Sequence, residues 1–153
     1  MEQKVVVSGS GLFTPEHSIS NEELVDSYNR YAAHFNQQNA EAIEAGTVVA
    51  LPYSSADFIH KASGIRSRYI YQKEGALDID RMRPKITPRA DDELSHQAEI
   101  GLAAARDALA NANKSANDID CIIVSCAYTQ RAYPAIAIEI QHALGVQGFA
   151  FDM

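Results

Sequence analysis

Two arginines at positions i and i+2 are the side chains best suited to binding a phosphorylated ligand. Arg66 and Arg68 fall in residues 65–71, where apolar and polar residues alternate as in a β-strand. Residues two apart on a strand point to the same face, so both guanidinium groups could contact one ligand through its phosphates. A strand face that is merely solvated would show the same spacing, and both interpretations stay open.

The two cysteines are the candidate nucleophiles. Cys121 and Cys126 lie in the nearly continuous apolar run of residues 119–127. Cys126 is at the end of this predicted strand, where α/β sheets place active sites and where a thiolate could attack a carbonyl carbon. No base can be assigned to it, so a core thiol is the favoured interpretation. Residues five apart on a strand point to opposite faces, which argues against a disulfide.

Other chemistry-bearing patterns are weaker. Gly9-Ser10-Gly11 follows the apolar residues 4–7, but Thr14 stands where a dinucleotide-binding loop has its third glycine, so a tight turn after a buried strand is predicted. The histidines lack the spacing and the accompanying cysteines of a zinc site, and no metal site is expected. Asp91-Asp92-Glu93 is interpreted as the start of a helix rather than as an acid/base pair.

Composition limits the possible partners. A chain of 153 residues with 46% hydrophobic and 22% charged content is ordinary for a globular domain. The net charge of -7 argues against a general nucleic-acid or anionic-membrane surface, because phosphate binding needs clustered cations. No signal peptide or membrane-spanning run is predicted, and a cytoplasmic protein in a reducing compartment is expected.

Helices and strands are predicted to alternate along the chain. Helices are expected to begin near Asn21, to cover 40–45 and 57–64, to run from Asp91 or Asp92 to about Asn113, and to extend from Pro134 to Gly145. Strands are expected at 4–7, at 65–71, at 119–127 as a central strand covered on both faces, and from Phe149. This order predicts an α/β fold with a mixed, mainly parallel sheet and helical layers. Residues 28–55 and 72–90 are interpreted as insertions.

Three groups of segments occur in a characteristic order. The first is Lys4 to Pro15 followed by Asn21-Glu22-Glu23-Leu24, and the second is Phe58-Ile59 through Ser63-Gly64-Ile65-Arg66-Ser67-Arg68. The third comprises residues 119–124, Tyr133-Pro134, residues 140–145 and residues 150–152. Together they resemble the amino-terminal half of β-ketoacyl-acyl-carrier-protein synthase III-like condensing enzymes, which have the thiolase fold.

The resemblance implies that this chain is one part of a longer protein. Residues 1–153 would form one amino-terminal thiolase-like half-domain, with the carboxy-terminal half absent and the nucleophilic cysteine expected just after Met153. No catalytic residue is then expected within the chain, which alone should be inactive and poorly soluble. The complete enzyme would be a homodimeric acyltransferase without a tightly bound cofactor. It would condense an acyl-CoA with malonyl-acyl-carrier protein by a decarboxylative Claisen reaction in fatty acid or related biosynthesis.

The resemblance also implies roles for individual residues. Phe58 stands where the family often has a tryptophan that stacks on the adenine of coenzyme A. Ser63, Arg66 and Arg68 would complete the coenzyme A site, although Ala62 replaces the usual arginine. Tyr133 occupies a position that approaches the partner's acyl pocket in such dimers, where its size would limit or shape the acyl chain.

Two further hypotheses remain beside the condensing enzyme. A noncatalytic thiolase-like module could hold coenzyme A or pair with a separate subunit. An unrelated nucleotide-binding α/β domain is a weaker possibility, since the third glycine is missing. The two insertions make an acyl primer longer than acetyl plausible.

Overall fold

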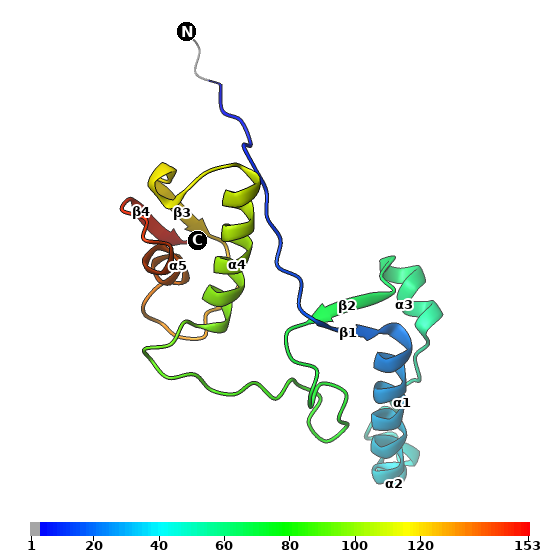
Figure 1. Cartoon of the computed structure of the whole chain (residues 1–153). Coiled ribbons are helices and arrows are strands. Elements are labelled where there is room, and N and C mark those ends of the chain that lie inside the picture. Colours follow the sequence, from blue (N-terminus) through cyan, green and yellow to red (C-terminus); the bar gives the residue numbers. More distant parts are fainter. Residues whose placement is uncertain (1–3) are drawn as a thin grey trace. The chain divides into compact units, whose positions relative to one another are not determined.

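The computed structural model describes residues 4–153, which divide into two units (Figure 1). One unit is Thr14–Thr87, here the hairpin unit. The other combines the described residues up to Phe13 with Pro88–Met153 and is called the parallel unit. Each unit has its own two-stranded sheet, antiparallel in the first and parallel in the second.

The hairpin unit begins with β1 (His17–Ser20), which pairs antiparallel with β2 (Ser67–Ile70). Helix α1 (Asn21–Gln38) follows β1 directly and starts where the sequence predicts. Its capping box is complete: the Ser20 hydroxyl accepts the Glu23 N–H at 3.1 Å, and the Glu23 carboxylate accepts the Ser20 N–H at 2.9 Å. This reciprocal pair satisfies N–H groups that have no partner within the helix.

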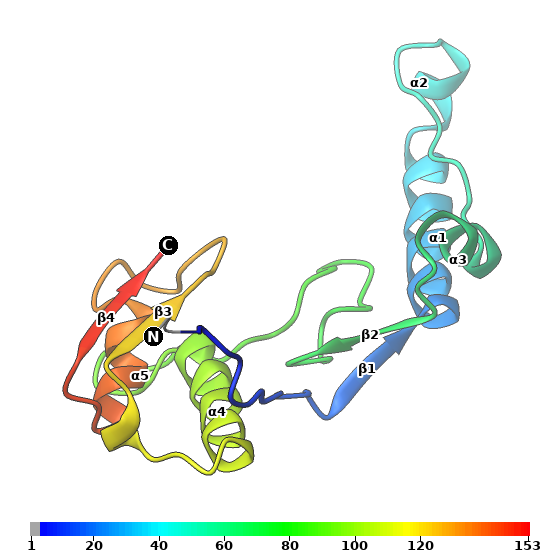
Figure 2. The same cartoon turned by 90° about the horizontal axis from the view of Figure 1, so that it is seen from above.

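The first predicted insertion is mostly helical. Helix α1 continues to Gln38, the short α2 (Ala40–Glu44) follows it, and the chain then returns along α1 toward α3 (Ala56–Ser63) (Figure 2). Two asparagines of α1 hold the returning segment. The Asn36 side chain donates to the Leu51 carbonyl at 2.9 Å and accepts the Leu51 N–H at 2.8 Å, and Asn29 bonds Ser54 in the same two ways. The chain is thus fastened to α1 without a strand.

The parallel unit has a helix pair packed on one face of its sheet. Helix α4 (His96–Asn111) lies beside α5 (Ile136–Leu144), and a short 3₁₀ helix (Ala116–Asp118) leads to β3 (Cys121–Val124). Strand β4 (Phe149–Asp152) pairs parallel to β3. The buried core consists of small and branched side chains from the two helices, namely Ala98, Leu102, Ile136 and Ile140.

A glycine permits the close contact between these two helices. A Cβ atom on Gly101 of α4 would lie only 2.7 Å from Cδ1 of Ile140 on α5.

The end of α5 is set by another glycine. Gly145 closes this helix with φ of +77°, a value that glycine adopts without steric cost.

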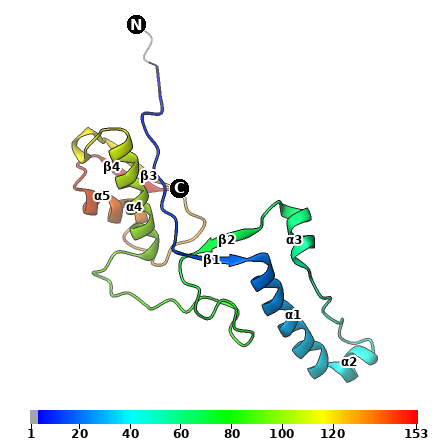
Figure 3. The same cartoon turned by 45° about the vertical axis from the view of Figure 1, so that its right-hand side comes forward.

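The predicted strand at residues 4–7 is wrong. These residues belong to no strand of the described chain, and Val5 and Val7 are almost fully exposed. The turn predicted at Gly9-Ser10-Gly11 is also wrong, because the segment runs extended along α4 (Figures 1 and 3). The glycines instead allow this segment to pass close to α4, because a Cβ on Gly11 would lie 2.2 Å from the backbone N of Ala108.

Two helix boundaries and the burial of one strand also need correction. Helix α4 starts after Ser95, whose hydroxyl accepts the Ala98 N–H at 3.1 Å, and not at Asp91 or Asp92. Helix α5 starts at Ile136 rather than at Pro134. The β3 strand is covered on one face only, since Cys121 and Ile123 are exposed. Within the described residues, no helix is both long and apolar enough to cross a lipid bilayer.

Candidate functional site

An apolar groove with a volume of about 740 Å³ lies between α1 and α3 in the hairpin unit. This volume is in the range of small-molecule sites. Leu24, Val25 and Tyr28 come from α1 at helical spacing, so they form one stripe facing the groove. The remaining lining residues are Pro52, Tyr53, Ser54, Ser55, Phe58, Ile59 and Met82.

Two aromatic rings stand in the wall of this groove. Phe58 lies in the first turn of α3 and is 65% exposed, and Tyr53 in the returning segment is also 65% exposed. The Ser55 hydroxyl accepts the Phe58 N–H at 3.1 Å, which fixes the helix start that carries the ring. Exposed aromatic faces at the edge of an apolar cleft are suited to stacking on a planar ring.

A smaller polar cleft of about 360 Å³ lies on another face of α3. It is lined by Ser20, Asn21, Glu22, Ala56, Asp57, His60 and Arg66. Hydrogen bonds from its own backbone N–H and from the Ser20 side chain lower the pKa of Glu22, and the nearby Arg66 guanidinium lowers it further. The cleft therefore presents charges of both signs, with Arg66 as its arginine.

The side chains of the other two predicted coenzyme A residues, Ser63 and Arg68, form hydrogen bonds within the fold. The Ser63 hydroxyl donates to the Ile59 carbonyl at 2.7 Å and accepts the Ile65 N–H at 3.2 Å. Arg68 donates to the side-chain oxygen of the buried Asn21 at 2.7 Å. Asn21 in turn donates to the Ile65 carbonyl at 2.7 Å, so this network joins the start of α1 to the segment before β2.

Phe58 and Arg66 thus line neighbouring clefts of one unit, whereas Arg68 lines neither. Tyr133 belongs to the parallel unit, on the loop between β3 and α5, and is 88% exposed. The thiol of Cys126 donates to the Tyr128 carbonyl at 2.9 Å, and both cysteines are free. Among the described residues, no three His, Cys, Asp or Glu side chains gather closely enough to hold a metal ion.

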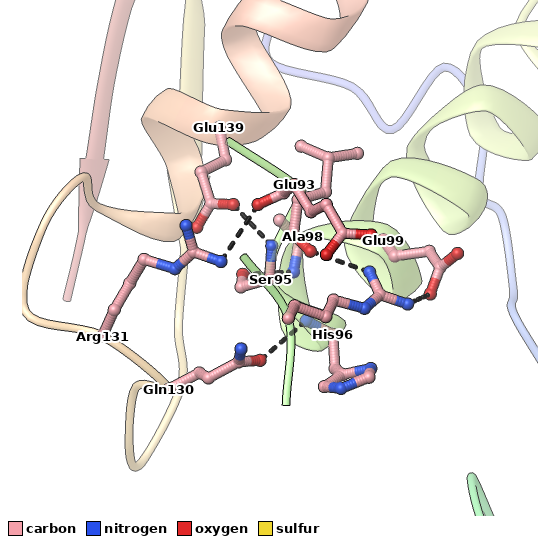
Figure 4. Close-up of polar contacts among 10 residues, drawn as sticks. Glu93, Ser95, His96, Ala98, Glu99, Gln130, Arg131 and Glu139 are labelled. Carbon is pink, nitrogen blue, oxygen red and sulfur yellow. Dashed lines mark hydrogen bonds and ion pairs between the residues drawn. The ribbon is translucent and has the colours of Figure 1, made fainter. Parts of the chain in front are cut away.

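The loop that carries Tyr133 is tied to the start of α4 (Figure 4). Arg131 donates to the carbonyls of Asp91 at 2.8 Å and Glu93 at 3.0 Å, and more weakly to that of Ala90 at 3.5 Å. The Gln130 side-chain oxygen accepts the His96 N–H at 3.0 Å.

The adjoining helix α5 also holds the start of α4. The buried Glu139 carboxylate accepts the Ser95 N–H at 2.6 Å, one residue before the first residue of α4. Sequence reasoning missed the roles of Arg131, Gln130 and Glu139. Their partners lie 34 to 44 residues away in the chain, so no local pattern signals them.

Sequence reasoning also missed Tyr53 and Met82 as groove residues. The predicted insertions 28–55 and 72–90 contain them, and no local periodicity marks either one. The only signal available was the α1 stripe, which indicates an apolar face without saying what covers it.

Comparison with known proteins places the chain among condensing enzymes, although no family model matches it. It is 52% identical over 129 residues to a β-ketodecanoyl-[acyl-carrier-protein] synthase of Pseudomonas aeruginosa, covering 84% of this chain and 37% of that protein. A β-ketoacyl-[acyl-carrier-protein] synthase III of Bartonella henselae is 32% identical over 149 residues, covering 97% of this chain and 32% of that protein. The chain thus spans about a third of the length of these relatives.

Solved structures agree at the level of the fold. The priming β-ketosynthase of the R1128 polyketide pathway matches with a TM-score of 0.60 and 23% identity, over 96% of this chain and 31% of that one. Xanthomonas campestris OleA with bound lauric acid and lauroyl-CoA matches with a TM-score of 0.60 and 18% identity, over 99% of this chain and 34% of that one. The thiolase-like α/β fold is confirmed at this coarse level. By its ordered motifs and these relatives, the chain belongs to the β-ketoacyl-acyl-carrier-protein synthase III-like family of condensing enzymes.

Proposed function

We propose that this chain forms part of an enzyme that condenses an acyl-CoA with malonyl-acyl-carrier protein. In this reaction a cysteine thiolate takes the acyl group from coenzyme A as a thioester. Malonyl-acyl-carrier protein then loses carbon dioxide, and the resulting carbanion attacks the thioester carbonyl and releases the thiolate. The nucleophilic cysteine is expected just after Met153, so the residues of this chain would bind the substrate and shape its pocket.

The observation that carries this proposal is the position of Phe58 in the groove, at the place where the family motif has its adenine-stacking aromatic residue. Phe58 offers an open ring face, and Tyr53 supplies a second ring in the same wall. On another face of α3, the guanidinium of Arg66 is available for a phosphate oxygen. An adenine ring beside phosphate groups is the pattern that coenzyme A presents.

We further propose an octanoyl primer. The Pseudomonas aeruginosa relative is named for a β-ketodecanoyl product. Decarboxylative condensation adds two carbons to the primer, so a β-ketodecanoyl chain arises from an octanoyl group. Neither acetyl nor a long-chain acyl group gives this product, and the primer choice is therefore testable by chain length.

The complete enzyme is proposed to be a cytoplasmic homodimer with a larger, mainly parallel sheet. Two features of the parallel unit support the larger sheet. Strands β3 and β4 form a parallel pair, and their outward residues Cys121, Ile123, Phe149 and Phe151 are exposed on one face. Apolar residues in the middle of a sheet are normally covered by another layer, which further chain or a second subunit would supply.

A noncatalytic coenzyme A-binding module is the second candidate function. The two clefts described above, around Phe58 and Arg66, lie in the hairpin unit and need no nucleophile. Binding without acyl transfer would favour this candidate.

Binding and labelling by the longer protein that carries this chain separate the two functions. With radiolabelled octanoyl-CoA, a condensing enzyme should acquire a covalent label that a thiol-blocking reagent prevents. Phe58→Ala should raise the Kd for coenzyme A about two- to twelvefold, since an aromatic contact is worth about 0.5–1.5 kcal/mol. Tyr69→Ala is the matched control, because Tyr69 is 68% exposed and lies outside both clefts.

Unchanged affinity in Phe58→Ala would refute the assignment of the groove. Tight binding without thiol-sensitive labelling would refute the catalytic role and leave the binding module. Labelling by the chain of residues 1–153 alone would contradict the expectation that the nucleophile lies beyond Met153.

A further inference from the structure

Tyr133 is not held in place by packing against the rest of this chain. Its side chain is 88% exposed, and it lies in a loop of residues 125–135 without helix or strand. A loop of this kind samples many conformations unless other contacts restrict it. A residue that shapes an acyl pocket must nevertheless present its ring at a fixed place, so the backbone of the loop has to be restrained.

The loop is restrained on the amino-terminal side of Tyr133 by Arg131 and Gln130. The Arg131 guanidinium reaches the carbonyls of Ala90, Asp91 and Glu93, two of them at 3.0 Å or less. The Gln130 side chain accepts the His96 N–H at 3.0 Å (Figure 4). These contacts join adjacent residues of the loop to the segment that leads into α4.

The loop is restrained on the other side of Tyr133 by the start of α5. The two carboxylate oxygens of Asp152, on β4, accept the N–H groups of Ile136 and Ala137 at 2.8 Å each. Tyr133 therefore lies between two anchors, two residues after Arg131 and three residues before Ile136.

We propose that Arg131 is a positioning residue for Tyr133 and thereby sets the acyl-chain selectivity of the enzyme. This inference rests on the proposed function and on the role in shaping the acyl pocket that the family resemblance implies for Tyr133. The contacts of Arg131 go to neutral carbonyls spread over four residues, and the planar five-donor guanidinium suits such an arrangement better than an ammonium group. Arg131 therefore restrains the loop through the geometry of its hydrogen bonds, and not through its charge alone.

The first test measures restraint of the loop without reference to activity. Chymotrypsin cleaves after Tyr128, which is 72% exposed in the same loop, only when the backbone can leave its anchored path. Cleavage there should be several-fold faster in Arg131→Ala, and Arg131→Lys should be intermediate. Cleavage after Tyr53 in the other unit is the internal standard, and Arg106→Ala, an exposed arginine on α4, is the matched control.

The second test measures selectivity as the ratio of kcat/KM for octanoyl-CoA to that for hexanoyl-CoA and decanoyl-CoA. Arg131→Ala should reduce these ratios about tenfold, the scale of a methylene contact in an apolar pocket. Tyr133→Ala should reduce them similarly without faster cleavage after Tyr128. The double variant should be no less selective than Tyr133→Ala, because both changes remove one function.

The inference is overturned if cleavage after Tyr128 is unchanged in Arg131→Ala. It is also overturned if that variant slows all primers equally, or if its effect on selectivity multiplies with that of Tyr133→Ala. A wild-type protein that condenses none of the three primers refutes the proposed function instead, while the proteolysis still reports on the restraint.

Discussion

Replacing Gly101 by alanine should have opposite effects on stability depending on the residue at position 140. The glycine lies inside α4, and the Cβ of an alanine there would be 2.7 Å from Cδ1 and 3.8 Å from Cγ1 of Ile140. Ile140 is only 3% exposed, so its side chain has little room to move away. A valine at position 140 has no Cδ1, so the closest remaining contact of the new Cβ would be with Cγ1 at 3.8 Å, an ordinary van der Waals distance.

The free energies follow from these two contacts. Alanine is about 1 kcal/mol better than glycine within a helix, whereas overpacking a core costs about 1–3 kcal/mol. Gly101→Ala alone should therefore be between neutral and about 2 kcal/mol destabilising. In the Ile140→Val background, which itself costs about 0.5–1.5 kcal/mol, Gly101→Ala should stabilise by about 1 kcal/mol.

Urea unfolding followed by far-ultraviolet circular dichroism measures this coupling, because the chain has no tryptophan. With a slope of about 2 kcal/mol per molar urea, a coupling of about 2 kcal/mol moves the midpoint by roughly 1 M. Ile136→Val is the control background, since Ile136 belongs to the same core cluster but not to the atoms nearest Gly101. Equal effects of Gly101→Ala in all three backgrounds would refute the steric reasoning.

Two other predictions concern the parallel and the hairpin units in turn. Gly11→Ala should destabilise by about 3 kcal/mol, because its Cβ would lie 2.2 Å from the backbone of α4, which cannot move aside; Ser8→Ala is the urea-unfolding control. Hydrogen bonds from Lys73 and from the Ser20 N–H lower the pKa of Glu23 in the folded chain. Its stabilising contribution is therefore complete above the ordinary glutamate pKa and is lost as the pH falls through the lowered one. Glu23→Gln should flatten the acid limb of stability against pH, and an unchanged limb would contradict this.

Local signals in the sequence were sufficient for several elements of the fold. Ser20 as a capping residue, with Glu22 and Glu23 in the first turn, predicts the start of α1, because these signals need only contacts within one turn. The glycines at 64 and 145 predict the ends of α3 and α5 for the same kind of reason, since each has a positive φ just after its helix.

The errors arise where distant contacts decide between local alternatives. Asp91, Asp92 and Ser95 are all acceptable helix caps, and the buried Glu139 carboxylate that receives the Ser95 N–H lies 44 residues away. The apolar residues 4–7 have the composition of a strand, but a strand also needs a neighbouring edge, which composition does not describe.

In the candidate site, too, local signals identify some residues, whereas contacts between distant residues decide others. Phe58 could be found from its motif, because a motif records a position along the chain. Tyr53 and Met82 could not, since they reach the groove only when the returning segment and the loop after β2 fold back to α1.

The exposed side of the β3–β4 pair gives this protein a built-in chemical reporter. Cys121 is exposed there beside Phe149, its register partner, while the Cys126 thiol is occupied by the Tyr128 carbonyl. The rate at which a maleimide alkylates Cys121 therefore reads out whether that surface is open to solvent. Protection of Cys121 from alkylation in the proposed complete enzyme would show that this surface is covered there.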